Sequence, residues 1–274
     1  MVVDDPIRMH VEPRLREPAL LLAFAGWNDA GDAATTTLRH VDTGIQSVPL
    51  AEIDADEFFD FTVRRPDVLQ RPVAKLQRGA PDAPIPRERV VVWPHTEFRY
   101  GSLDETRELI TGIGAEPHLR WRSYCDAVVE LCRRLRVARV VLLGAYQADV
   151  VYSQPVPVTG FATEESELSV LEVESSDYQG PTGIIGVLGA RLEEEGIPVV
   201  SLWAGLPHYI NATPNPRGAL ALFQRLARCL ALDIDPEPLV ARAAEFEEQI
   251  AKLVASDPEL ADYVRELKKR EFAS

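Results

Sequence analysis

Short apolar runs alternate along this chain with longer segments in which apolar residues recur at helical spacing. The runs at residues 20–25, 138–144 and 197–207 have the continuous apolar character of strands that are buried on both faces. Segments with helical periodicity lie at residues 32–41, 120–135, 181–195 and 215–232. This alternation predicts an α/β fold, in which a mixed, mostly parallel sheet lies between two layers of helices.

Further strands are expected at residues 47–54, 58–63, 90–94, 108–114 and 156–163. The run at 90–94, Val-Val-Val-Trp-Pro, is typical of a buried strand that ends at a proline. Residues 64–89 contain five prolines and predict a loop-rich excursion, with a short hairpin near residues 74–76.

The C-terminal part of the chain changes character. Apolar residues recur at helical spacing over residues 236–255, and a second helix is expected from about residue 258, with a capping box at Ser256–Glu259. We therefore predict a core of residues 1–234 and a helical appendage of residues 235–274. The appendage packs either on its own core or, alternatively, on a partner subunit.

Composition excludes several classes of protein. The chain has 29 basic and 43 acidic residues and a net charge of -14, which argues against nucleic acid as a partner because phosphate binding needs a basic surface. It has no signal-peptide pattern and no apolar run of about 20 residues, so we expect a cytoplasmic protein that does not enter a membrane. Its three cysteines suit reduced thiols, and Cys125 and Cys132 fall on one predicted helix face toward the core. No metal or cofactor is predicted, because no metal-ligand spacing is present.

Candidate functional residues lie in loops that follow the predicted strands, where α/β folds usually bind ligands. The loops are 26–31, 115–118, 144–150, 175–183 and 207–214. They supply the candidate ligand-binding residues Gly26, Trp27, Asp29, Gly31, Gly144, Gly180, Thr182 and Gly183. They also supply the candidate acid–base residues Glu116, Asp149 and His208, which could act together if the loops converge.

Each of these loops also has a purely structural interpretation. The stretch Gly-Trp-Asn-Asp-Ala-Gly at 26–31 lacks the glycine spacing of a dinucleotide site and the lysine of a P-loop. Its glycines can serve tight turns, Asp32 can cap the following helix, and Trp27 can fill space between elements. The Gly180–Gly183 turn can bind an anion or only start a helix. No Gly-x-Ser-x-Gly nucleophile motif is present.

Several blocks of sequence together resemble the proteasome assembly chaperone family, in its bacterial branch. They include FAGWNDAGDAA from residue 24, LGAYQADVVYSQPVPVTG from 143, SSDYQGPTGIIGVL from 175 and GIPVVSLWAGLPHYI from 196. The resemblance covers residues 20 to 264 and implies an α/β/α fold similar to nucleoside phosphorylases and related hydrolases. It also implies self-association, with a trimer as the leading expectation, and proteasome subunits as possible partners. Family members dock through a C-terminal hydrophobic–Tyr–any motif, whereas this chain ends Phe272-Ala273-Ser274.

Three hypotheses of function follow, and the third of them is a purely structural trimer whose loops are vestigial. In the first, the protein is a non-catalytic oligomeric assembly factor, which the family resemblance and the lack of a catalytic signature favour. In the second, it is an enzyme on a phosphorylase-like or carboxylate–amine ligase-like scaffold that binds a small ligand at the strand-end loops. Phosphate-handling enzymes use arginine for that purpose, and the candidate loops contain almost none.

Overall fold

A computed structural model describes residues 5–72 and 87–271 of the chain. Nine strands form one sheet: β1 (Ile7–Met9), β2 (Ala19–Ala25), β3 (Val48–Ile53), β6 (Thr96–Ser102), β7 (Glu108–Ala115), β8 (Arg139–Ala148), β9 (Val158–Ala162), β10 (Glu174–Ser175) and β11 (Val199–Pro207). Their order across the sheet is β1-β3-β6-β7-β2-β8-β11-β9-β10. The four central strands β7, β2, β8 and β11 are parallel neighbours, while β6 and β9 flank them in the antiparallel direction.

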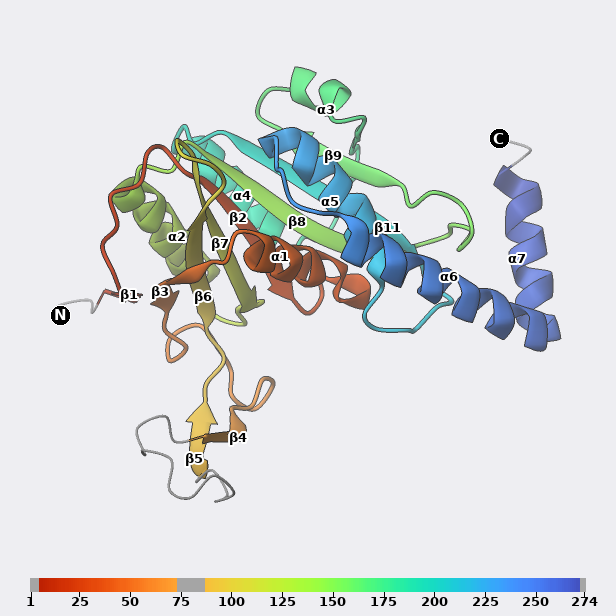
Figure 1. The fold of residues 1–274 in the computed structure, drawn as a ribbon, viewed down its shortest axis with the longest axis horizontal. Coiled ribbons are helices and arrows are strands. Elements are labelled where there is room, and N and C mark those ends of the chain that lie inside the picture. Colours follow the sequence, from red (N-terminus) through yellow and green to blue (C-terminus); the bar gives the residue numbers. More distant parts are fainter. Residues whose placement is uncertain (1–4, 73–86, 272–274) are drawn as a thin grey trace.

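Helices cover both faces of this sheet (Figure 1). On one face lie α2 (Trp121–Leu135) and α4 (Ile184–Glu194), which pack with Leu20, Leu22 and Phe24 of β2. On the other face lie α1 (Ala33–Gly44) and α5 (Pro216–Leu230), which pack with Leu21 and Ala23. Successive residues of β2 thus enter opposite cores, which explains why this strand is apolar without interruption. The predicted three-layer α/β/α fold with a mixed sheet is confirmed.

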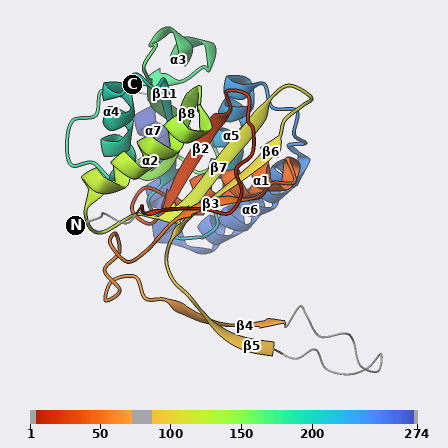
Figure 2. The same ribbon diagram turned by 90° about the vertical axis from the view of Figure 1, so that its left-hand side faces the viewer.

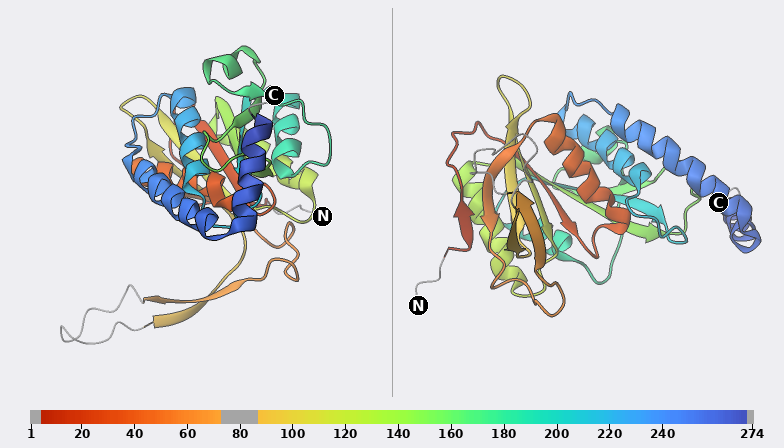
Figure 3. Two further views of the ribbon diagram at one scale, coloured as in Figure 1. Left: turned by 90° about the vertical axis from the view of Figure 1, so that its right-hand side faces the viewer. Right: turned by 60° about the horizontal axis from the view of Figure 1, so that its bottom comes forward.

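The C-terminal segment forms two helices, α6 (Glu237–Ser256) and α7 (Pro258–Glu271), as predicted (Figure 3). Leu239 of α6 joins the core beneath α5, and Ile250 and Val254 pack with Val151 and Ile210 from two strand-end loops. The capping box expected at Ser256–Glu259 is wrong in its capping residue, which is Asp257 and not Ser256. Asp257 Oδ1 accepts the backbone N–H groups of Glu259 and Leu260, while Ser256 Oγ donates to a carbonyl of α6.

Several local predictions are also wrong. The expected strand at 58–63 is a pair of turns, in which Phe58 and Phe59 are buried and Asp60 Oδ1 binds both the N–H and the hydroxyl of Thr62. The apolar residues of this segment correctly indicated burial. However, the side chain of Asp60 accepts hydrogen bonds that stabilise a turn, so the backbone does not pair with a neighbouring strand. Strands β1 and β6 and the short helix α3 (Ser166–Val170) were not expected.

A second, two-stranded sheet projects away from the body of the molecule, opposite α3 (Figure 2). It consists of β4 (Asp67–Pro72) and β5 (Arg87–Val92). The strand expected at 90–94 therefore exists, but it is not a buried strand, since Val91 is 52% exposed. The hairpin expected near residues 74–76 lies outside the described residues. Among the described residues, no helix is long and apolar enough to cross a membrane.

Candidate functional site

The parallel strands β2, β7, β8 and β11 bring their carboxyl ends to one edge of the sheet, and the loops that follow them meet there. Backbone contacts join these loops directly. Ala145 N–H of β8 donates to Asn28 carbonyl oxygen at 2.8 Å, and Glu116 N–H donates to Ala25 carbonyl oxygen at 3.0 Å. The sequence could not show whether the strand-end loops meet. In the structure, the loops at 26–31 and 115–118 do meet at this edge of the sheet.

Asp29 uses its carboxylate to cap a helix. Its Oδ1 accepts the N–H of Ala34 at 2.7 Å, and its Oδ2 accepts the hydroxyl of Thr35 at 2.6 Å and the N–H of Thr35 at 3.2 Å. Asp29 is 4% exposed, and this burial raises its pKa, while the hydrogen bonds from Thr35 and Ala34 oppose the rise. The first turn of α1 is thus held by a buried carboxylate.

The prediction that Asp32 caps α1 is wrong. Asp32 lies in the left-handed region, with a φ of 49°, and its side chain makes no capping hydrogen bond. A short 3₁₀ turn at Ala30–Asp32 separates Asp29 from the helix, so the capping residue lies one turn earlier than expected. Gly31, with a φ of 56°, stands against Asn215, the residue that caps α5 through Gly218 N–H.

Glu116 occupies the beginning of α4. Its Oε1 accepts the N–H of Ile184 at 2.8 Å. A Cβ added to Gly183 would overlap Asn28 Oδ1 and lie 2.8 Å from Glu116 Oε1, so only glycine fits at this position. The helix start that was a candidate anion site therefore already holds a carboxylate of the protein itself.

Asn28, which sequence analysis did not single out, lies at the centre of this junction. It is fully buried, and neither its Oδ1 nor its Nδ2 has a hydrogen-bond partner among the described residues. Such an unpaired amide costs stability. No pattern in the sequence distinguishes Asn28 from the polar residues beside it. Its burial depends on contact between the loop at 26–31 and Gly183, which is distant in sequence.

The other candidates in these loops have different surroundings. Trp27 is 65% exposed, so the expectation that it fills space between elements is wrong. Gly144 lies within β8 rather than in a loop, opposite Trp203 of β11, where a Cβ would overlap the indole ring. Gly180 packs against the Tyr178 ring, and the exposed Thr182 makes only a long contact, 3.5 Å, to Gly183 carbonyl oxygen.

Asp149 and His208 do meet, at the ends of β8 and β11. His208 Nδ1 lies 3.1 Å from Asp149 Oδ1, and the hydroxyl of Tyr263 lies 3.3 Å from His208 Nε2. The imidazole also stands edge-on to the rings of Tyr209 and Tyr263. Both polar side chains are open to solvent, 40% for His208 and 76% for Asp149. Glu116, the third predicted acid–base residue, makes no described contact with either.

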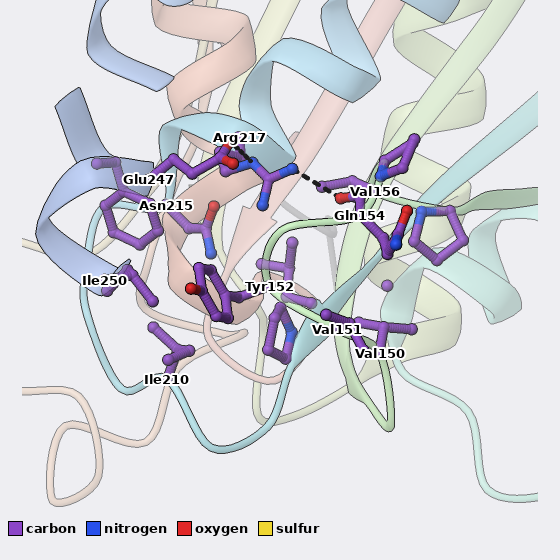
Figure 4. Close-up of a pocket in the computed structure, with 16 residues that line it drawn as sticks. Val150, Val151, Tyr152, Gln154, Val156, Ile210, Asn215, Arg217, Glu247 and Ile250 are labelled. Atoms are coloured by element: carbon purple, nitrogen blue, oxygen red, sulfur yellow. Dashed lines mark hydrogen bonds and ion pairs between the residues drawn. The ribbon is translucent and has the colours of Figure 1, made fainter. Parts of the chain in front are cut away.

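This second cluster holds the C-terminal helix in place. Tyr263 belongs to α7, and the same face of α7 buries Val264 and Leu267 against Val151 and Ile210. A neighbouring hollow between the loop at 150–157 and α6 has a volume of only about 10 Å³, so at most one water fits there. Figure 4 shows Arg217 crossing this hollow between Glu247 and Gln154.

A larger groove, of about 430 Å³, lies beside β6 and β7 on the side of α1. It collects cationic side chains that the strand-end loops lack: Arg39, Arg64, Arg65 and Arg99. Arg99 pairs with Glu97 at 2.9 Å and donates to Ser47, whereas the other three guanidinium groups form no ion pair with a described residue. None of the sequence-predicted site residues lines this groove.

The acidic side chains at this edge of the sheet are mostly engaged by the protein itself. Two of the buried or half-buried carboxylates, Asp29 and Glu116, are committed to helix starts, and the exposed Asp149–His208 pair faces a tyrosine that anchors α7. No group of three or more metal-ligating side chains occurs within residues 5–72 and 87–271.

Comparison with known proteins gives a consistent result. A model of the PAC2 family matches residues 23–254. A PAC2 family protein from Streptomyces avermitilis is 35% identical, with a TM-score of 0.78 over 90% of this chain and 99% of that protein. A proteasome-assembly chaperone homologue from Mycobacterium tuberculosis is also 35% identical, with a TM-score of 0.76 and the same coverage.

A more distant structure shares the fold alone. PbaB from Pyrococcus furiosus, an archaeal proteasome activator, is 20% identical, with a TM-score of 0.67 over 90% of this chain and 97% of that protein. No curated protein sequence matches the chain.

Proposed function

Because this chain belongs to the PAC2 family, we propose that it is a non-catalytic protein-binding factor that assists the assembly of other proteins. The observation that carries the proposal is the match to the family model over residues 23–254. The surroundings of Asp29 and Glu116 support it, since both carboxylates accept hydrogen bonds from the starts of helices.

Proteasome subunits are the proposed partners. The homologue from M. tuberculosis is described as a proteasome-assembly chaperone homologue, and PbaA from P. furiosus as an archaeal homologue of such a chaperone. We extend this partner class to the present chain. The family's docking motif has a tyrosine where the given sequence carries Ala273, so the proposed binding is not assigned to residues 272–274.

The protein is further proposed to act in the cytoplasm as a homo-oligomer, with a trimer as the leading arrangement. Three free cysteines and the absence of a membrane-spanning helix among the described residues are compatible with this location. The enzyme alternative gains no support from the described residues, because the arginines gather in the groove beside β6 and not at the start of α4.

Assembly of the proteasome α-ring in the presence of the purified chain tests the proposal. α-Subunits from the same host are mixed with the chain, and complexes are resolved by size-exclusion chromatography with light scattering. We expect co-elution with α-subunits and faster ring formation. A variant lacking residues 272–274 is the matched control and should bind equally well. Absence of both binding and acceleration would overturn the assembly function.

A further inference from the structure

The projecting two-stranded sheet exposes apolar side chains that another protein surface could cover. We call this sheet, together with the residues at its base that also line the groove beside β6, the arm: residues 64–72 and 87–93. Its cross-strand pairs include Val68 with Val91 and Leu69 with Val90, and Val68, Leu69, Val91 and Trp93 are each 44% to 52% exposed. Neighbouring residues of a strand point to opposite faces, so apolar side chains are exposed on both faces of the arm. A lone two-stranded sheet of this kind is only marginally stable in water.

The arm is also basic, in contrast to the rest of the chain. It contains five arginines, Arg64, Arg65, Arg71, Arg87 and Arg89, and two acidic residues, Asp67 and Glu88, while the whole chain has a net charge of -14. No guanidinium group of the arm forms an ion pair with another described residue. A surface that combines unpaired arginines with exposed apolar side chains suits an acidic, partly apolar protein surface.

Such a surface exists on the chain itself. We call residues 161–178 the acidic segment; it includes α3 and β10. It has no lysine or arginine and six acidic residues, Glu164, Glu165, Glu167, Glu172, Glu174 and Asp177. Arg139 and Arg228 pair with Glu167 and Glu172, which leaves the other four without an ion pair among the described residues. The acidic segment also exposes large side chains: Phe161 at 43%, Tyr178 at 66% and Val170 at 77%.

The arm and the acidic segment lie at opposite ends of the molecule, as the views in Figures 1, 2 and 3 agree. One copy cannot bring its own arm to its own acidic segment. Two complementary surfaces at opposite ends produce a head-to-tail contact, in which every copy uses both surfaces, and such contacts close into rings when the rotation allows.

We infer that the arm of one copy of this chain docks on the acidic segment of the next. The second copy is favoured as occupant because both halves of the contact, apolar area and opposite charge, are present on the same molecule. The contact also opposes the general repulsion between copies that each carry a charge of -14. The inference rests on the proposed self-association and names the surfaces that produce it.

Exchange of the two charges tests this contact. One variant carries Arg87→Glu and Arg89→Glu, which lie on one face of β5 opposite Pro72 and Gln70, so the change adds no like-charge pair across the strands. The other carries Glu165→Lys and Glu174→Lys, both exposed. Light scattering should give a multiple of 30.4 kDa for the unmodified chain and 30.4 kDa for each variant alone. An equimolar mixture should associate into complexes with an even number of copies, because the new glutamates of one variant then face the new lysines of the other.

A control variant, Arg14→Glu with Arg122→Glu, changes exposed arginines elsewhere by the same charge and should keep the oligomer. Val91→Ser leaves the charge unchanged and should also weaken the oligomer. Association in the mixture shows that both charge variants are folded. The inference is overturned if the unmodified chain is a single copy, if the arm variant stays oligomeric, or if the mixture fails to associate while both variants keep the unmodified melting temperature.

Binding of α-subunits, measured on the same samples, separates this inference from the proposed function. An oligomer that follows the charge exchange but binds no α-subunit refutes the assembly function alone. If the chain binds α-subunits but its oligomeric state is unchanged by the charge substitutions, the head-to-tail contact alone is refuted.

Discussion

Glu116 Oε1 accepts a hydrogen bond of 2.8 Å from the backbone N–H of Ile184, and this bond ties the end of β7 to the start of α4. A carboxylate at a helix N-terminus satisfies a free N–H group and interacts favourably with the helix dipole. The residue that looked like an acid–base candidate from sequence therefore contributes to the junction of two layers of the fold.

Removal of this cap should destabilise the protein. We expect Glu116→Ala to lower the free energy of unfolding by about 0.5–2 kcal/mol, the usual cost of losing a helix cap. Glu116→Gln keeps an acceptor oxygen and should lose less. Urea denaturation measures the difference, with Glu105→Ala, at an exposed loop position, as the control. Equal stability of Glu116→Ala and the unmodified chain would contradict the assigned cap.

A side chain at Gly183 should destabilise the protein. Its Cβ would overlap the buried Asn28 amide and press on Glu116, so Gly183→Ala should cost about 1–3 kcal/mol through overpacking. Gly189, inside the helix α4 that Gly183 precedes, is the control, because its Cβ would lie 3.5 Å from Leu142, an ordinary contact distance. Gly189→Ala should stabilise the helix by up to about 1 kcal/mol. Thermal melting of both variants checks the contrast, and equal effects at the two sites would refute it.

The buried Asp29 should make stability depend on pH in an unusual direction for an acid. Burial raises its pKa in the folded protein above the ordinary value of 3.8, so the folded state holds this proton more tightly than the unfolded state. Its contribution to stability is therefore fully present below pH 3.8 and is lost as pH rises through the raised pKa.

Asp29→Asn removes this contribution while keeping one acceptor oxygen for the cap. We expect the stability of the unmodified chain, relative to Asp29→Asn, to fall with rising pH across that window. Urea denaturation over a pH series gives the two curves. A relative stability that rises with pH would show that the hydrogen bonds from Thr35 and Ala34 outweigh burial.

Much of the fold was predictable from the sequence, and the reasons lie in particular elements. The run at 20–25 is apolar throughout because Leu21 and Leu22 enter opposite cores, and this pattern alone indicates a doubly covered strand. Strand β6, Thr96–Ser102, was missed because it mixes polar, aromatic and glycine residues and has no continuous apolar run, although it lies between β3 and β7. The position of β6 is set by antiparallel pairing with β7, and the local sequence pattern does not predict this pairing.

The site was less predictable, because the roles of its residues depend on which loop meets which helix. Asp29 and Asp32 are both plausible caps in sequence, and the left-handed backbone at Asp32 decides between them. Asp149 and His208 could be paired from their positions after neighbouring strands. Their partner Tyr263 could not, since it arrives on a helix 55 residues further along the chain.

Tyr263 should act as an anchor for α7. Its ring stands edge-on to His208 and Tyr209 at 5.6 and 5.4 Å between centroids, and each such pair is worth about 0.5–1.5 kcal/mol. Tyr263→Ala should therefore increase the hydrogen exchange of α7 amides while β8 amides keep their protection. Asp262→Ala, whose side chain is 70% exposed, is the neighbouring control. Unchanged exchange in α7 after the Tyr263 substitution would refute the anchor.

The cysteines should be unreactive in the folded protein. Burial raises the pKa of both Cys125 and Cys132 to about 12, and it also raises the pKa of Cys229. Because the thiolate is the reactive form, a disulfide reagent at mildly alkaline pH should label Cys125 and Cys132 only at the rate of unfolding. Cys229 is partly exposed and should account for any faster labelling, which Cys229→Ser should abolish. In denaturing urea all three thiols should react at once. Rapid labelling of Cys125 or Cys132 without denaturant would mean that α2 opens independently of the core, since both residues lie on its buried face.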